Sequence, residues 1–121
     1  MKIERFEDIE SWIEARELTK VIYSTTKKEN FRRDFGLKDQ IQRASVSIMA
    51  NIAEGFDSRS DKVFLNFLNY AYRSTSEVQS LLYAALDQKY ISKEELENFY
   101  QKCQSIQGLI GGLIKYLKTE K

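Results

Sequence analysis

Seven apolar residues recur at spacings of three and four near the end of this chain, and they constrain its fold more than any other feature. They are Leu96, Phe99, Cys103, Ile106, Ile110, Leu113 and Leu117. Because an α-helix turns by about 100° per residue, this spacing places all of them on one face of a helix. An apolar face of this length is buried only against other helices, so the pattern predicts a helical bundle.

The rest of the chain also favours helices. It has no proline and only five glycines in 121 residues, so few positions interrupt a helix. Apolar periodicity predicts a first helix over residues 8–26, with Asp8 as its cap, and a second helix over residues 37–54. The charged segment between them, KKENFRRDFG, lacks periodicity and is predicted to be a connection.

Two capping-box patterns mark the later helices. Residues 58–61, SRSD, resemble one that opens a third helix ending near Lys89. Residues 92–95, SKEE, form a better one, just before the helix that carries the apolar seam. Short connections make neighbouring helices antiparallel. The chain is therefore predicted to be all-α, a single domain over residues 1–121 that forms an antiparallel up-down-up-down four-helix bundle.

Charge and residue usage exclude several classes of function. The 19 Lys and Arg against 18 Asp and Glu leave a net charge of +1, whereas nucleic-acid-binding domains are usually clearly basic. The chain has no histidine, and Cys103 is its single cysteine, so an intrachain disulfide and a cysteine-based zinc site are both excluded. We therefore expect no cofactor, no metal, and a Cys103 side chain that is buried as a small hydrophobe.

No segment has the pattern of a signal peptide or a membrane-spanning helix. The start, MKIERFEDIESW, is charged where a signal peptide is apolar, and the charge-free stretch CQSIQGLIGGLI is short and contains glutamine and glycine. We expect a cytoplasmic protein without membrane contact. The GLIGG in that stretch lacks the ending of a phosphate-binding loop, so we expect these glycines to allow close packing.

The second predicted helix is apolar over more than half of its circumference. On a helical wheel, the sector that faces the bundle core contains Leu37, Ile41, Ala44, Ile48, Ile52 and Gly55. A second apolar sector contains Val46, Met49, Ala50, Ala53 and Phe56. An isolated four-helix bundle has one core, so the second sector would be left in water. It predicts a subunit interface in a homo-oligomer.

A narrow polar line separates these two sectors. It contains Gln40, Arg43, Ser47, Asn51 and Glu54. These side chains can bond along the helix or pair with Arg73 and Glu77 of the third helix, which predicts a structural polar network. The alternative is an enzyme that uses Arg43 and Glu54 to process a small molecule in a cleft between subunits. No nucleophile or histidine stands beside them in the sequence to support that reading.

One local group of basic residues stands out in this nearly neutral chain. It consists of Lys27, Lys28, Arg32 and Arg33, all in the first connection and interrupted by Glu29. These four are the candidate contacts to the phosphates of a nucleic acid. The alternative is a solvated loop without a partner.

Several strings in the chain resemble those of a known family. They are FEDIESWIEARELTKVIY, FGL at residues 35–37, QIQRASVSIMANIAEGF and SRSDKVFLNFLNYAYRSTSEVQSLL. With them the chain resembles the four-helix-bundle proteins encoded by intervening sequences in bacterial 23S ribosomal RNA genes. The resemblance covers essentially the whole chain. The matching positions that carry it are Arg43-Ala44, Ser47-Ile48, Asn51 to Gly55 and Glu77.

The resemblance implies a four-helix bundle that assembles into rings, commonly homopentamers, with no established enzymatic activity. A related class of proteins serves as an accessory subunit beside a reverse transcriptase and binds nucleic acid through basic surfaces. The near-neutral charge of this chain fits that second property poorly. We therefore expect a non-catalytic oligomeric scaffold that presents a symmetric ring surface to RNA or to a protein partner.

Overall fold

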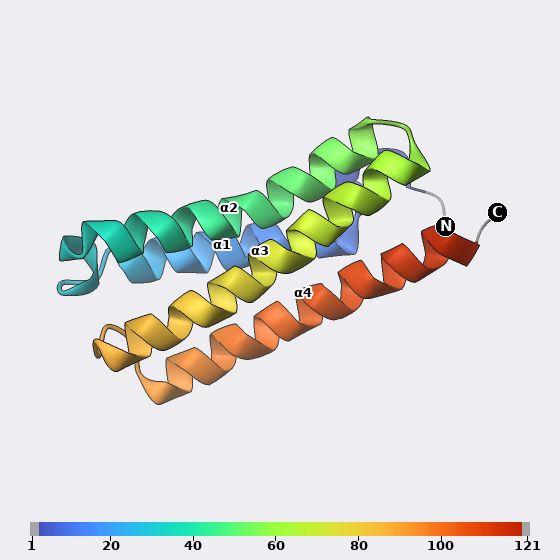
Figure 1. The fold of residues 1–121 in the computed structure, drawn as a ribbon. Helices are drawn as coiled ribbons and strands as arrows, with labels where there is room; N and C mark the ends of the chain where they lie inside the picture. Colours follow the sequence, from blue (N-terminus) through green and yellow to red (C-terminus); the bar gives the residue numbers. More distant parts are fainter. Residues whose placement is uncertain (1–2, 120–121) are drawn as a thin grey trace.

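The computed structural model describes residues 3–119, and within this range the chain forms four α-helices and two short 3-10 helices. The α-helices are α1 (Glu10–Thr26), α2 (Phe35–Asp57), α3 (Asp61–Asp87) and α4 (Lys93–Thr119). The 3-10 helices are Phe6–Asp8, before α1, and Phe31–Arg33, between α1 and α2. Successive α-helices run in opposite directions along one elongated bundle (Figure 1). The predicted all-α four-helix fold is confirmed.

The core lies between the helices, and each helix contributes one stripe of apolar side chains. α2 packs against α1 and α3, and α4 packs against α3 and α1. The seven seam residues of α4 are all buried, and so is the core sector predicted for α2, except that Leu37 is partly exposed. Each fully buried Leu or Ile stabilises the fold by about 1.5–3 kcal/mol relative to exposure, so this core is the main source of stability.

α2 and α3 are in close contact at Gly55. A β-carbon at this position would lie 2.7 Å from Cβ of Phe67 and 2.9 Å from Cδ1 of Phe64. Protein interiors are too closely packed to absorb such an overlap without moving a side chain or a helix. Glycine at residue 55 therefore sets how closely these two helices approach.

The first two helices begin differently from the sequence prediction. Asp8 does not cap α1, because it lies in the preceding 3-10 helix and the N-cap position is taken by Ile9. Ile9 is buried in the core, so an apolar contact, rather than a polar cap, holds the start of α1 in place. α2 begins at Phe35 instead of residue 37, because the carboxylate of Asp34 accepts a hydrogen bond from the backbone N–H of Leu37 at 3.1 Å.

The last two helices begin close to the predicted capping signals. α3 is capped by Ser60 and not by Ser58, which donates its hydroxyl hydrogen to a carbonyl at the end of α2. The capping box before α4 is confirmed. The hydroxyl of Ser92 accepts a hydrogen bond from the backbone N–H of Glu95 at 3.0 Å, and the Glu95 carboxylate accepts one from the backbone N–H of Ser92 at 2.8 Å.

The connections that follow α2 and α3 both contain a residue with left-handed backbone geometry. Arg59 has a φ of 60° and Lys89 a φ of 64°. This conformation costs a residue that carries a β-carbon about 1–2 kcal/mol, which is why glycine usually stands there. α2 ends at Asp57 and not at the predicted Glu54, because Gly55 does not end the helix but lies within it, packed against α3.

Candidate interaction surfaces

One sector of α2, opposite the part of the helix that faces the core, carries apolar side chains beside the exposed Asp39. At 100° per residue, Phe35, Val46, Ala50 and Ala53 fall in one sector of α2, opposite the fully buried Ile48. We call these four residues the α2 outer face. Phe35 is 73% exposed, Val46 is 39% exposed, and the two alanines are partly exposed. The fold therefore leaves an apolar surface without a cover from residues 3–119.

The predicted subunit interface is shared between this surface and the core. Met49, Ala53 and Phe56 are partly buried against the chain's own core, whereas Val46 is exposed. Phe35 was not predicted to belong to it, although it is the most exposed large apolar side chain of the described residues. Its spacing would have revealed it, because Phe35 stands eleven residues before Val46 (46 − 35), which is about three helical turns.

The polar line of α2 brings three small polar side chains together. The hydroxyls of Ser47 and Ser74, on α2 and α3, are hydrogen-bonded at 3.0 Å. The Asn51 amide donates to the Ser47 carbonyl at 2.8 Å and to its hydroxyl at 2.9 Å. Ser74 was not predicted as a member. These bonds join α2 to α3 and leave no ionisable group in the cluster.

The four charged residues of the predicted polar network do not pair with one another. Arg43 pairs with Asp39, one turn earlier on α2, at 2.9 Å. The guanidinium of Arg73 lies 5.2 Å from the ring centroid of Tyr70, and Glu77 accepts a hydrogen bond from the Gln40 amide at 3.5 Å. The carboxylate of Glu54 is exposed and forms no hydrogen bond or ion pair within residues 3–119.

The basic residues of the first connection are mostly paired with carboxylates. Arg33 lies 2.8 Å and Arg32 3.5 Å from the carboxylate of Glu29. Lys28 forms an ion pair with Glu95 of α4, while Lys27 is exposed. These pairs are exposed, so each contributes about 1 kcal/mol or less, but they reduce the positive potential that a phosphate would meet.

The Lys28 pair also changes the acidity of its partner. The hydrogen bond from Lys28, followed by the capping hydrogen bonds with Ser92, lowers the pKa of Glu95 below its ordinary value. Glu95 therefore connects the cap of α4 to the end of α1. This contact supports a structural role for Lys28.

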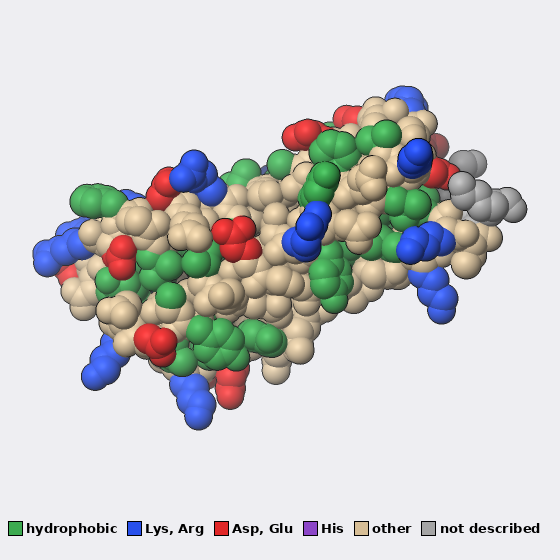
Figure 2. Space-filling view, in the orientation of Figure 1, with side chains coloured by type: hydrophobic (Ala, Val, Ile, Leu, Met, Phe, Trp, Pro, Cys, Tyr) green, Lys and Arg blue, Asp and Glu red, His purple; other side chains and the backbone are tan. Residues whose placement is uncertain are grey.

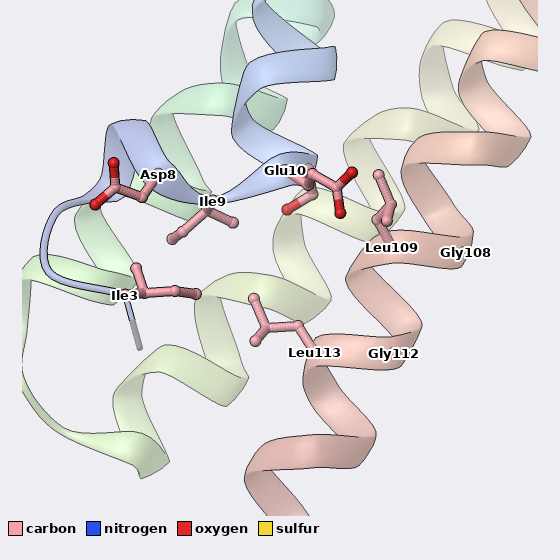
Figure 3. A pocket seen from close by; sticks show the side chains of 9 residues that line it. Ile3, Asp8, Ile9, Glu10, Gly108, Leu109, Gly112 and Leu113 are labelled. Carbon is pink, nitrogen blue, oxygen red and sulfur yellow. The ribbon is translucent and has the colours of Figure 1, made fainter. Parts of the chain in front are cut away.

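A cavity of about 380 Å³ lies between the start of α1 and α4 (Figure 3). Its apolar walls include Ile3, Ile9, Leu109 and Leu113. Ser11 also lines it; this residue is 2% exposed, and its hydroxyl has no hydrogen-bond partner within residues 3–119. Arg43 and Glu54, the proposed pair of the enzymatic alternative, do not line this cavity.

The glycines of α4 do not pack closely against the rest of the chain, contrary to the prediction. A β-carbon on Gly108, Gly111 or Gly112 would meet no heavy atom within 4 Å among the described residues. The reason is that the seven seam residues of α4 face the core. The glycines lie on the other side of the helix, which faces outward. Gly108 and Gly112 instead widen the cavity beside Ile9.

Cys103 lies in the core and has no reactive environment. Burial raises its pKa to about 12, so the thiol stays protonated at neutral pH. Among residues 3–119, no group of three or more His, Cys, Asp or Glu side chains is placed to hold a metal ion. None of the helices in the described part of the chain is long and apolar enough to span a membrane.

Comparison with known proteins identifies a family and related solved structures. The family model described as 23S rRNA-intervening sequence protein matches residues 7–112. A crystal structure of a protein of unknown function from the S23 ribosomal protein family of Bacteroides thetaiotaomicron has 27% sequence identity and a TM-score of 0.80. The match covers 87% of this chain and 95% of that chain. No curated protein sequence matches the chain.

Proposed function

Because the chain belongs to the 23S rRNA-intervening sequence protein family, we propose that it works as a non-catalytic scaffold, a homo-oligomer that presents repeated copies of one surface to a partner macromolecule. The assembly we propose is a closed ring of five copies, as the family resemblance implies. The observation that carries the proposal is the α2 outer face, an apolar surface that the chain itself leaves exposed.

Burial of this surface against another copy would favour association. Burying a side chain such as Phe35 or Val46 stabilises by about 1.5–3 kcal/mol relative to full exposure, and less for the part already covered. A stable interface usually buries about 800 Å² on each partner. With two such interfaces per copy, a ring would bury roughly a fifth of the 7347 Å² that the chain exposes.

We propose a protein rather than RNA as the partner of this scaffold. The support is the pairing of Lys28, Arg32 and Arg33 with carboxylates, together with a net charge of +1. RNA affinity would show itself as a steep dependence on salt, because each phosphate contact in a single strand contributes about −0.7 to the slope of log affinity against log salt. A titration of RNA at two salt concentrations separates the partners: salt-dependent binding that is lost when all four basic residues become Gln indicates RNA.

The scaffold proposal is tested by placing a charge on the α2 outer face. Ala50→Glu should abolish association, because an unpaired carboxylate would be buried between copies. Lys20→Gln is the matched control, since it changes the net charge by the same amount at an exposed site on α1. Light scattering reports the assembly, and circular dichroism reports the fold. An Ala50→Glu variant that assembles like the control would refute the role of this face.

A further inference from the structure

Phe35 forms an isolated apolar projection at one end of the bundle. It is the first residue of α2, it is 73% exposed, and the ammonium of Lys38 lies 5.1 Å from its ring centroid. Hydrophobic side chains reach the surface of the bundle at this end (Figure 2). An exposed phenylalanine at a helix start gains little stabilisation within its own chain.

A pocket at the same end of the bundle is apolar and large enough to admit this projection. It has a volume of about 550 Å³ and lies between the end of α3 and the start of α4. Its apolar walls are Tyr83, Leu86, Leu96 and Tyr100. The rings of Tyr83 and Tyr100 meet edge to face with centroids 6.0 Å apart, so a third aromatic ring could pack against them in the same manner.

Hydrogen bonds in the middle of the bundle show which residues of α2, α3 and α4 lie at the same height along the bundle, and the heights of Phe35 and the pocket follow by counting residues from there. Ser47 bonds to Ser74, and Gln107 donates to Ser76 at 2.9 Å, so these parts of α2, α3 and α4 are level. Phe35 is twelve residues before Ser47 (47 − 35). Leu86 is twelve residues after Ser74 (86 − 74), and residue 95 is twelve before Gln107 (107 − 95). α2 and α4 run in one direction and α3 in the other (Figure 1), so all three positions lie at one height.

This equality of height is what a ring requires when its axis is parallel to the bundle. Rotation about an axis parallel to the bundle carries each copy to the next without changing height, so a projection meets only sites at its own level. The cavity beside Ile9, at the other end of the bundle, fails this condition. The pocket between α3 and α4 lies at the height of Phe35 and so meets this condition. The pocket and Phe35 are on different helices, so a contact between them is heterologous: each copy would use Phe35 toward one neighbour and the pocket toward the other.

The charges around the two sites are complementary. Phe35 is followed one turn later by Lys38 and Asp39, and the pocket is lined by Lys93 and Glu97. Asp39 is already paired with Arg43, so Lys38 is the charge that the Phe35 side offers, opposite Lys93 and Glu97 of the pocket. Lys38 forms no ion pair within residues 3–119, and neither does Glu97. A neighbouring copy would supply each with an opposite charge at the edge of the apolar contact.

We propose that Phe35 of one copy inserts into the pocket between α3 and α4 of the next copy, with Lys38 facing Glu97 across the contact. This inference rests on the homo-oligomer proposed above and specifies how its neighbouring subunits recognise each other. The contact also includes part of the α2 outer face, because Phe35 is the member of that face at the end of the bundle.

The test is cross-linking between engineered cysteines. A chain that carries both Phe35→Cys and Glu97→Cys is treated with a short bismaleimide at neutral pH, where the buried Cys103 stays protonated and unreactive. We expect a ladder of covalent oligomers up to the size of the ring. The control pairs Phe35→Cys with Lys115→Cys, an equally exposed site at the far end of α4, and should give no ladder.

The outcomes separate this inference from the function on which it rests. Light scattering of the untreated double variant reports assembly independently of cross-linking. An oligomeric double variant without a ladder overturns the Phe35 contact and leaves the scaffold proposal standing, whereas a wild-type chain that is a monomer overturns both. Phe35→Asp should in addition raise the concentration at which the wild-type assembly dissociates by about tenfold to a hundredfold, while Phe35→Leu should change it much less.

Discussion

Replacing Gly55 by alanine should destabilise the protein, although alanine favours helix formation more than any other residue. The reason is the close contact between α2 and α3. The new β-carbon would lie 2.7 Å from Cβ of Phe67, an atom attached directly to the α3 backbone, and 3.4 Å from Cα of Phe64. Neither atom moves by side-chain rotation, so the two helices must separate.

The magnitude follows from two opposing terms. Alanine in a helix interior is favoured over glycine by about 1 kcal/mol. Overpacking a well-packed contact costs about 1–3 kcal/mol, and two overlaps below 3 Å favour the upper part of that range. We therefore expect Gly55→Ala to lower the free energy of unfolding by about 2 kcal/mol.

The same substitution at Gly111 provides the control. A β-carbon there meets no heavy atom of the described residues within 4 Å, so Gly111→Ala should raise the free energy of unfolding by up to about 1 kcal/mol. Both variants are measured by urea unfolding monitored by circular dichroism, at one protein concentration, because association shifts apparent stability. A Gly55→Ala protein that is as stable as the wild type would refute the packing argument.

Three further predictions concern single side chains. Cys103 should react with a thiol reagent at neutral pH only after denaturation, because burial raises its pKa to about 12; rapid labelling of the folded protein would contradict its burial. Ser92→Ala should lower the free energy of unfolding by about 1 kcal/mol through loss of the α4 cap, while Ser80→Ala, at an exposed site on α3, should not. The hydrogen bond from Tyr90 to Asp34 raises the pKa of the phenol, so its stabilising effect is complete below the ordinary pKa of tyrosine and is lost as the pH rises through the higher folded value. The stability difference between the wild type and Tyr90→Phe should therefore shrink at high pH, and a constant difference in pH titrations of unfolding would exclude this hydrogen bond as its cause.

The parts of the fold that were predictable are those that depend on residues close in sequence. The seam from Leu96 to Leu117 needs only the period of a helix, and the Ser92 capping box needs only a spacing of three. The start of α2 was missed, because the segment before it is charged and lacks apolar periodicity. The structure shows that Phe31, in that segment, is buried and stacks on Tyr90, with the two ring centroids 4.9 Å apart. This contact joins distant parts of the chain.

The polar line of α2 shows where prediction from spacing stops. The bond from Asn51 to Ser47 lies within one helix and follows from a separation of four residues. The bond from Ser47 to Ser74 depends on the rotation of α2 against α3, which no local pattern specifies. Arg43 pairs along its own helix, which was one of the two alternatives left open, but with Asp39, which the predicted network did not include. The open side of α4 at its glycines likewise depends on how the whole helix is turned.

The most direct test of the proposed scaffold is the mass of the native assembly. Native mass spectrometry, with light scattering at micromolar concentration, should give one dominant species near five times the 14.2 kDa of the chain. A different closed number would correct the ring size and leave the role of the α2 outer face intact. A stable monomer of 14.2 kDa would contradict the account, because the exposed apolar residues of α2 would then have no partner copy to cover them.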